Sequence, residues 1–203
     1  MGFFERNRRD LAAAGIDPER LPPGQYHTTR FPVLHAGDVP EVDPASWDFT
    51  VGGLVERPLR LSFDEFRSLP TREVTADIHC VTKWSKFDTR WEGVPVGEIL
   101  GRAGPLPAAT HAVVRAERDF TANLSIDDLA AEGNLLAWRY DGEELARDHG
   151  WPLRLVVPHL YFWKSVKWVR GIDLLDRDEP GFWERNGYHL RGDPWKEQRY
   201  WGD

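Results

Sequence analysis

The stretch Glu73-Val-Thr-Ala-Asp-Ile-His-Cys-Val-Thr-Lys-Trp-Ser85 indicates the fold class, because its first half alternates apolar and polar residues. Val74, Ala76 and Ile78 share one face, which is typical of a half-buried β-strand. Cys80 continues this apolar face where the strand enters a loop. Outward from it, short strand patterns alternate with short helix patterns. This arrangement predicts an α+β fold with mixed β-sheets and short helices.

The other predicted elements are brief. Strands are expected at 47–54, 59–61, 111–116, 135–140, 153–157 and 166–175, and a helix at 96–103. Two further short helices are expected after Ser62 and Ser125, because each serine is followed three residues later by a carboxylate that can complete a capped helix start.

The chain divides into three regions by composition. Residues 1–25 are rich in proline, glycine and charge, and are expected to form an N-terminal extension. Residues 26–178 hold the strand patterns and are expected to form the main domain. Residues 179–203, the C-terminal segment, are aromatic, and a segment this apolar should pack on the body or on a partner.

Composition excludes several classes of protein. Cys80 is the only cysteine in 203 residues, so an internal disulfide or a cysteine-rich metal cluster cannot form. The net charge of −7 argues against a general nucleic-acid-binding protein. The most apolar segment, 155–163, is too short for membrane insertion, and the N-terminus lacks the apolar core of a secretion signal. We expect a cytoplasmic protein.

Three interpretations of Cys80 follow from its chemistry. Lys83 and Lys86 stand close in sequence and would favour a thiolate, the form that binds soft metals. A buried and inert thiol is the second interpretation. The third is a cysteine hydrolase, in which a histidine serves as base.

A positive island interrupts this acidic chain at residues 151–172, which contain no Asp or Glu. It carries four basic side chains, Arg154, Lys164, Lys167 and Arg170. Together with His149 and Ser165 they offer donors suited to phosphate or another anion. The alternative is a solvated strand edge on which lysines serve solubility.

Three segments together resemble a known family. Cys80-Val-Thr-Lys-Trp-Ser85, followed by Trp91-Glu-Gly-Val94, resembles the cofactor-cysteine segment of sulfite-oxidase-like molybdopterin-binding oxidoreductases. His149-Gly-Trp-Pro-Leu-Arg-Leu-Val-Val-Pro158 resembles a strand of that family, and 161–168 resembles its lysine-rich closing segment. The likeness covers about residues 26–176 and is greatest to compact, haem-free bacterial members.

The resemblance implies a sulfite-oxidase-type fold whose main domain binds one molybdopterin. It implies that Cys80 ligates molybdenum. The implied cofactor-binding residues are His35, Arg30, Phe31, Cys80, His149, Arg154, Ser165, Val166 and Lys167. Two candidates join Cys80 in catalysis: Lys83 would steer an anionic substrate, and Asn123 would stand on the substrate side of the pocket.

The implied function is a molybdenum–molybdopterin oxidoreductase that catalyses two-electron oxygen-atom transfer. Phe120, Ser85 and Val33 stand where sulfite oxidases place a tyrosine and two arginines, so sulfite oxidation is not expected. Reduction of a small-molecule S- or N-oxide is the candidate reaction, with a separate electron-transfer partner. The alternative is a catalytically silent molybdopterin-binding or carrier module. The oligomeric state stays open.

Overall fold

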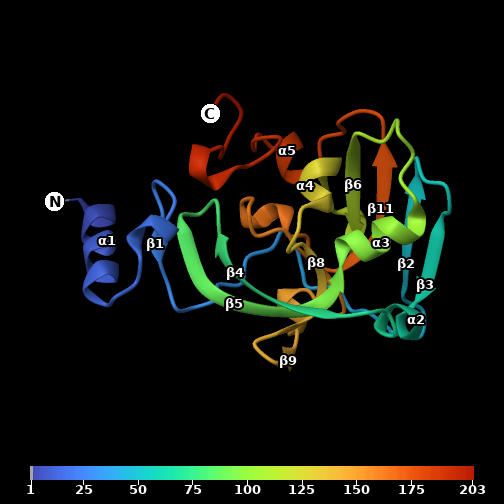
Figure 1. Cartoon of the computed structure of the whole chain (residues 1–203), viewed down its shortest axis with the longest axis horizontal. Coiled ribbons are helices and arrows are strands. Elements are labelled where there is room, and N and C mark those ends of the chain that lie inside the picture. Colours follow the sequence, from blue (N-terminus) through green and yellow to red (C-terminus); the bar gives the residue numbers. More distant parts are fainter. Residues whose placement is uncertain (1) are drawn as a thin grey trace.

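The computed structural model describes residues 2–203, which form two β-sheets joined by short helices (Figure 1). The six-stranded sheet contains β1 (Tyr26–His27), β4 (Arg72–His79), β5 (Trp84–Pro95), β8 (Leu135–Tyr140), β9 (Glu143–Glu144) and β10 (Arg154–Val156). The five-stranded sheet contains β2 (Asp48–Gly53), β3 (Leu59–Ser62), β6 (His111–Ala116), β7 (Thr121–Ser125) and β11 (Val169–Leu175).

The helices are short and scattered between the strands. The α-helices are α1 (Phe3–Ala13), α2 (Phe63–Arg67), α3 (Val96–Ala103), α4 (Ile126–Ala130) and α5 (Phe182–Arg185). Single 3₁₀ turns occur at Pro18–Arg20, Glu117–Asp119, Arg147–His149, Phe162–Lys164 and Pro194–Lys196. No helix within residues 2–203 is long and apolar enough to cross a membrane.

Both sheets are mixed, as expected for the α+β class. In the larger sheet β1 runs parallel to β5, and the other pairs are antiparallel. In the smaller sheet β11 runs parallel to β2, and its other pairs are antiparallel. The predicted fold class is therefore confirmed.

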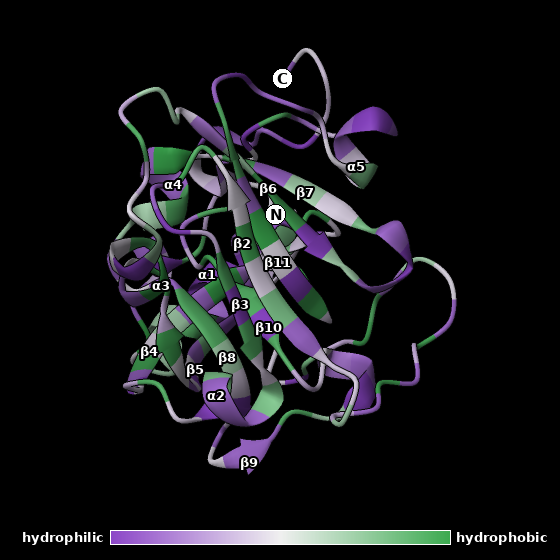
Figure 2. Ribbon diagram, turned by 90° about the vertical axis from the view of Figure 1, so that its right-hand side faces the viewer, coloured by the Kyte–Doolittle hydropathy of each residue, from purple (hydrophilic) through white to green (hydrophobic). Residues whose placement is uncertain are grey.

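The core occupies the space where the sheets and the short helices meet. Apolar residues run along the strands of both sheets, whereas the short β9 is hydrophilic (Figure 2). The main cluster packs residues of β2, β6 and β11 against α3 and β8. A second, more aromatic cluster surrounds Cys80 and includes Trp84, Trp91 and Phe162. The cysteine therefore lies on a rigid, close-packed base.

Most predicted strands agree with the structure, but one starts later than predicted. The predicted strand at 166–175 begins only at Val169, because Trp168 has a left-handed backbone with φ 55°. The elements absent from the predicted set include α1, β1, β5, β7 and α5. Strand β5 buries Ser85 and Thr89 beside Phe87 and Trp91, so polar residues interrupt its apolar alternation.

Candidate active site

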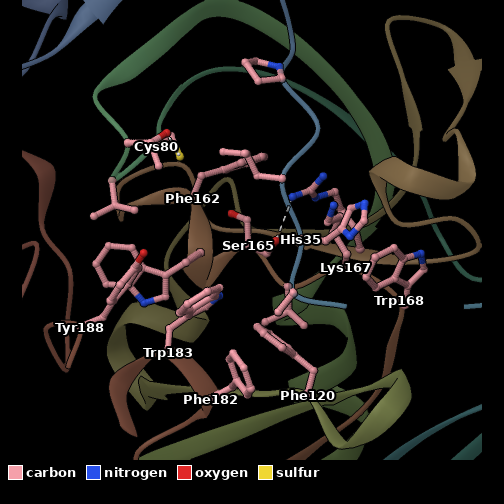
Figure 3. A pocket seen from close by; sticks show the side chains of 18 of the residues that line it. His35, Cys80, Phe120, Phe162, Ser165, Lys167, Trp168, Phe182, Trp183 and Tyr188 are labelled. Atoms are coloured by element: carbon pink, nitrogen blue, oxygen red, sulfur yellow. Dashed lines mark hydrogen bonds between the residues drawn. The ribbon is translucent and has the colours of Figure 1, made fainter. Parts of the chain in front are cut away.

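A cavity of about 320 Å³ opens between the two sheets and the C-terminal segment. Its lining comes from six parts of the chain: residues 32–40, the turn from β4 into β5, the turn between β6 and β7, Arg154 of β10, the stretch 162–168, and the C-terminal segment. Figure 3 shows Cys80 and Tyr188 on one side of it and His35, Lys167 and Trp168 on the other. The cavity therefore has two chemically different ends.

Cys80 lies at the end of β4, in a tight turn that leads into β5. The turn is closed by hydrogen bonds from Lys83 N to Cys80 O (2.9 Å) and from Cys80 N to Trp84 O (2.8 Å). Lys83 occupies the left-handed position of the turn, with φ 78°. The Sγ atom of Cys80 lies 3.2 Å from Oγ1 of Thr82. A rigid turn thus presents a single thiol to the cavity.

Burial raises the pKa of the Cys80 thiol, and the hydrogen bond from Thr82 and the charge of Arg199 oppose that rise. The nearby cation is thus Arg199 of the C-terminal segment, whereas Lys83 is exposed and lies over the ring of Phe4. Within residues 2–203 no histidine forms a hydrogen bond with Cys80, and the neighbouring His79 bonds Ser85 instead (2.8 Å). The hydrolase interpretation therefore has no base.

The turn that carries Cys80 is held by both ends of the chain. Nε2 of Gln25 donates to the carbonyl oxygen of Cys80 at 3.1 Å. Nη1 of Arg199 donates to the carbonyl oxygen of Val81 at 2.8 Å, and this guanidinium is 8% exposed. These bonds fix the thiol's position from two sides.

Arg154 provides the other end of the cavity with a buried positive charge. It is 3% exposed, and its guanidinium donates only to carbonyl oxygens, those of His149 (2.8 Å) and Ser165 (3.0 Å). Its Nε atom has no hydrogen-bond partner within residues 2–203. Burial lowers the pKa of Arg154 to about 9. A buried cation without a counter-charge is a site prepared for an anion.

Lys167 adds a second cation beside Arg154. Its Nζ donates to the carbonyl oxygen of Asp148 at 2.7 Å, and within residues 2–203 it forms no ion pair with a carboxylate. Burial, together with the charge of Arg154, lowers the pKa of Lys167 to about 7. Gly150 lets β10 and the segment before β11 approach closely: with φ +114°, a Cβ there would lie 3.1 Å from both Arg154 and Lys167.

Six of the residues expected at the site line the cavity: His35, Cys80, Arg154, Ser165, Val166 and Lys167. Phe31 and His149 are not in its lining. Their rings stack at 4.0 Å, and burial lowers the pKa of His149 to about 4. Phe31 lies 5.9 Å from the Arg154 guanidinium, so these two rings support it.

Three expected residues lie elsewhere. Arg30 and Lys83 are exposed, and neither lines the cavity. Asn123 is buried outside the cavity, where its Nδ2 donates to Asp178 (2.7 Å) and its Oδ1 accepts from Lys164 (2.7 Å). The structure therefore gives Asn123 a contact with Lys164 and none with the cavity.

Sequence reasoning missed part of the cavity wall. Phe182, Trp183 and Tyr188 of the C-terminal segment line it, as does Arg118, whereas Phe120 was singled out by the resemblance and also lines it. The aromatic content of the segment signalled burial, but its sequence did not show which surface it covers. Of the tryptophans inside the recognised motifs, Trp84, Trp163 and Trp168 line the cavity.

Comparison with known proteins gives one family. Residues 36–183 match the model of the oxidoreductase molybdopterin binding domain. The chain is 51% identical over 185 residues to the uncharacterized oxidoreductase YuiH of Bacillus subtilis (strain 168), covering 91% of this chain and 93% of that protein.

More distant relatives are longer proteins. The chain is 33% identical to the protein-methionine-sulfoxide reductase catalytic subunit MsrP of Gluconobacter oxydans (strain 621H), over 70% of this chain and 51% of the relative. It is 32% identical to the sulfite oxidase of Gallus gallus, over 74% of this chain and 39% of the relative. It thus spans about half of the first protein and 39% of the second.

A solved structure shows the same fold. The sulfane dehydrogenase SoxCD of Paracoccus pantotrophus superimposes with a TM-score of 0.64 at 24% identity, over 71% of this chain and 42% of that chain. The match of the family model to most of the chain agrees with the single thiol and the anion-binding corner described above. The chain belongs to the oxidoreductase molybdopterin binding domain family and is an enzyme of the sulfite-oxidase-like type.

Proposed function

We propose that this chain is a molybdenum–molybdopterin oxidoreductase that reduces a small-molecule S- or N-oxide by two-electron oxygen-atom transfer. The observation that carries the proposal is the pairing, across one cavity, of a fixed thiol with a buried cationic corner that has no counter-charge. One end suits a soft metal and the other a phosphate.

The donor set fits the cofactor that the family implies. Arg154 and Lys167 would bind the phosphate of molybdopterin, with the hydroxyl of Ser165 and the ring of His35 in the same lining. Cys80 would ligate molybdenum as thiolate, and the hydroxyl of Thr82, 3.2 Å away, would then donate a hydrogen bond to the sulfur. When bound, the cofactor supplies the two-electron redox chemistry. The protein binds it, orients it and excludes water.

The surroundings of Cys80 support an uncharged oxide rather than sulfite. Ser85 is fully buried and bonds His79, and Phe120 in the cavity wall has no hydroxyl. Val33 is 40% exposed and does not line the cavity. Arg118 does line it, but its guanidinium faces Asp38 at 3.7 Å. A dianion would therefore meet few free donors near the thiol. The similarity to MsrP also favours a sulfoxide.

Metal content and dye oxidation test this function. Protein from a host that makes molybdopterin should hold about one molybdenum per chain and should oxidise reduced viologen when a sulfoxide or N-oxide is added. Cys80→Ser should change the visible absorption and abolish turnover. Stoichiometric pterin without molybdenum, and no turnover with any oxide, would instead indicate a carrier module.

The compartment and the electron donor belong to the same proposal. We place the enzyme in the cytoplasm, which cell fractionation would test. A separate electron-transfer partner would deliver electrons to the domain at 26–178, and affinity capture under reducing conditions followed by reconstitution with the captured redox protein would identify it.

A further inference from the structure

Four aromatic rings form one wall of the cavity, and Tyr188 is the one on the same side as Cys80 (Figure 3). Phe120 follows β6, and Phe182, Trp183 and Tyr188 belong to the C-terminal segment. Phe120 and Phe182 lie 5.4 Å apart, and Phe182 meets Trp183 edge to face at 5.1 Å. Trp183 and Tyr188 stack at 4.9 Å. We call these four residues the aromatic wall, and Figure 3 shows them together.

The aromatic wall is held rigidly by buried polar contacts. Glu184, next to Trp183, forms an ion pair with Lys164 at 2.7 Å, and both side chains are 0% exposed. The same carboxylate oxygen accepts a hydrogen bond from Nε1 of Trp163 at 2.8 Å. At Gly181 an added Cβ would lie 2.5 Å from the backbone of β7. The rings are therefore preorganised, as a binding surface requires.

Position and charge assign the aromatic wall to substrate rather than to the cofactor's phosphate. Lys167 lies across the cavity from Tyr188, beside His35 and Trp168 (Figure 3), and the charge of Arg154 acts on Lys167 from the same cationic corner. The four rings carry no charge, and Tyr188 contributes their only hydroxyl. Within residues 2–203 this hydroxyl forms no hydrogen bond, so it is free to donate one to a bound molecule.

We propose that the aromatic wall is the substrate-binding surface, and that it selects an uncharged oxide carrying an aromatic ring. In this arrangement the ring packs on Phe182 and Trp183, and the Tyr188 hydroxyl donates a hydrogen bond to the oxide oxygen. The inference rests on the proposed oxide reduction and names its substrate class. The reaction is R₂S=O + 2 H⁺ + 2 e⁻ → R₂S + H₂O, with both electrons from the separate electron-transfer partner or, in the assay, from reduced viologen.

Kinetics with paired substrates test the selection. The molybdenum-loaded enzyme should reduce methyl phenyl sulfoxide with a kcat/KM about 10- to 100-fold above that for dimethyl sulfoxide, because only the first fills the wall. Trp183→Leu should remove most of this preference by raising KM for the aromatic oxide. Tyr188→Phe should lower kcat for both oxides about 10- to 100-fold. Trp201→Leu is the matched control, because Trp201 is 63% exposed and outside the cavity.

Binding measured without turnover tests the aromatic wall separately from the proposed oxide reduction. Calorimetry of methyl phenyl sulfoxide with the oxidised holoenzyme, without a reductant, should show binding that Trp183→Leu weakens at least tenfold. Binding of this kind with no reduction of any oxide would refute the proposed function and keep the aromatic wall. Equal kcat/KM for both sulfoxides would refute the wall alone. Loss of pterin from Trp183→Leu, measured by pterin fluorescence, would show that the wall holds the cofactor and would also overturn the inference.

Discussion

Replacing Glu184 by glutamine is expected to loosen the C-terminal segment and to destabilise the whole chain. The substitution keeps the volume and an acceptor for Trp163, but it removes the negative charge that faces Lys164 at 2.7 Å. Breaking a fully buried ion pair by removing one partner costs about 3–5 kcal/mol. Lys164 keeps hydrogen bonds to Asn123 and to the carbonyl oxygen of Leu190, so the lower end of about 3 kcal/mol is expected.

For a domain of this size that loss corresponds to a fall in Tm of about 6–12 °C. Differential scanning calorimetry of Glu184→Gln measures it, and Arg177→Gln is the control. Arg177 pairs with Glu179 at 3.1 Å on the surface, with 73% of its side chain exposed, so its loss should cost under about 1 kcal/mol. Equal Tm shifts in the two variants would refute the assignment of Lys164–Glu184 as the anchor.

The stability of the Glu184→Gln variant should also depend on pH in a different way from that of the wild type. Burial already lowers the pKa of Lys164, and Glu184 opposes that shift, so the pKa falls further in Glu184→Gln. A lysine whose pKa is lower in the folded state makes the chain less stable as pH falls from the ordinary pKa towards that lower pKa, and the loss is constant below it. The difference in Tm between wild type and Glu184→Gln should therefore shrink from pH 7 towards the ordinary lysine pKa of 10.5. A difference that grows over this range would contradict the account.

Four further predictions concern the cofactor corner, the larger sheet and α3. Lys167→Met should lower the affinity of the apo-protein for molybdopterin by about 10- to 100-fold, because a charge-assisted hydrogen bond worth about 1.5–3 kcal/mol is lost. Pterin fluorescence after loading checks this, with the exposed Lys196→Met as control. A bound phosphate raises the pKa of Lys167 above its free value of about 7. The affinity of the wild type for molybdopterin should therefore fall as pH rises above 7, by at most about tenfold per pH unit. The Lys167→Met variant should show no such fall. Gly93→Ala should destabilise the chain by about 1–3 kcal/mol or more in urea unfolding, because its Cβ would lie 2.1 Å from a carbonyl oxygen of β8. Gly97→Ala, in open space on α3, should instead stabilise it by about 0.5–1 kcal/mol.

Sequence period and motif spacing were enough to predict the place of Cys80. The alternation that leads into it is local, and β4 ends at His79 as that alternation predicts. The family resemblance then predicted Arg154, Ser165 and Lys167 as binding residues, and all three line the cavity. In these cases the information lies within a few residues of the side chain concerned.

What could not be predicted depends on contacts between distant parts of the chain. The sequence suggested that Lys83, three residues away, would act on the thiol, yet Arg199 is the cation that does so. The late start of β11 depends on the left-handed Trp168, a conformation that propensity does not favour. Asn123 similarly lies in a strand that packs beneath Lys164 and not beside the cavity.

The hydrogen bonds that hold the cysteine turn also set the order of steps in the maturation of this protein. Gln25 and Arg199 hold adjacent carbonyl groups, those of Cys80 and Val81, although most of the chain separates them in sequence. A ribosome synthesises Gln25 long before Arg199. The thiol therefore reaches its final position only after residue 199 has been made, and a cofactor that needs the fixed thiol would enter after that point.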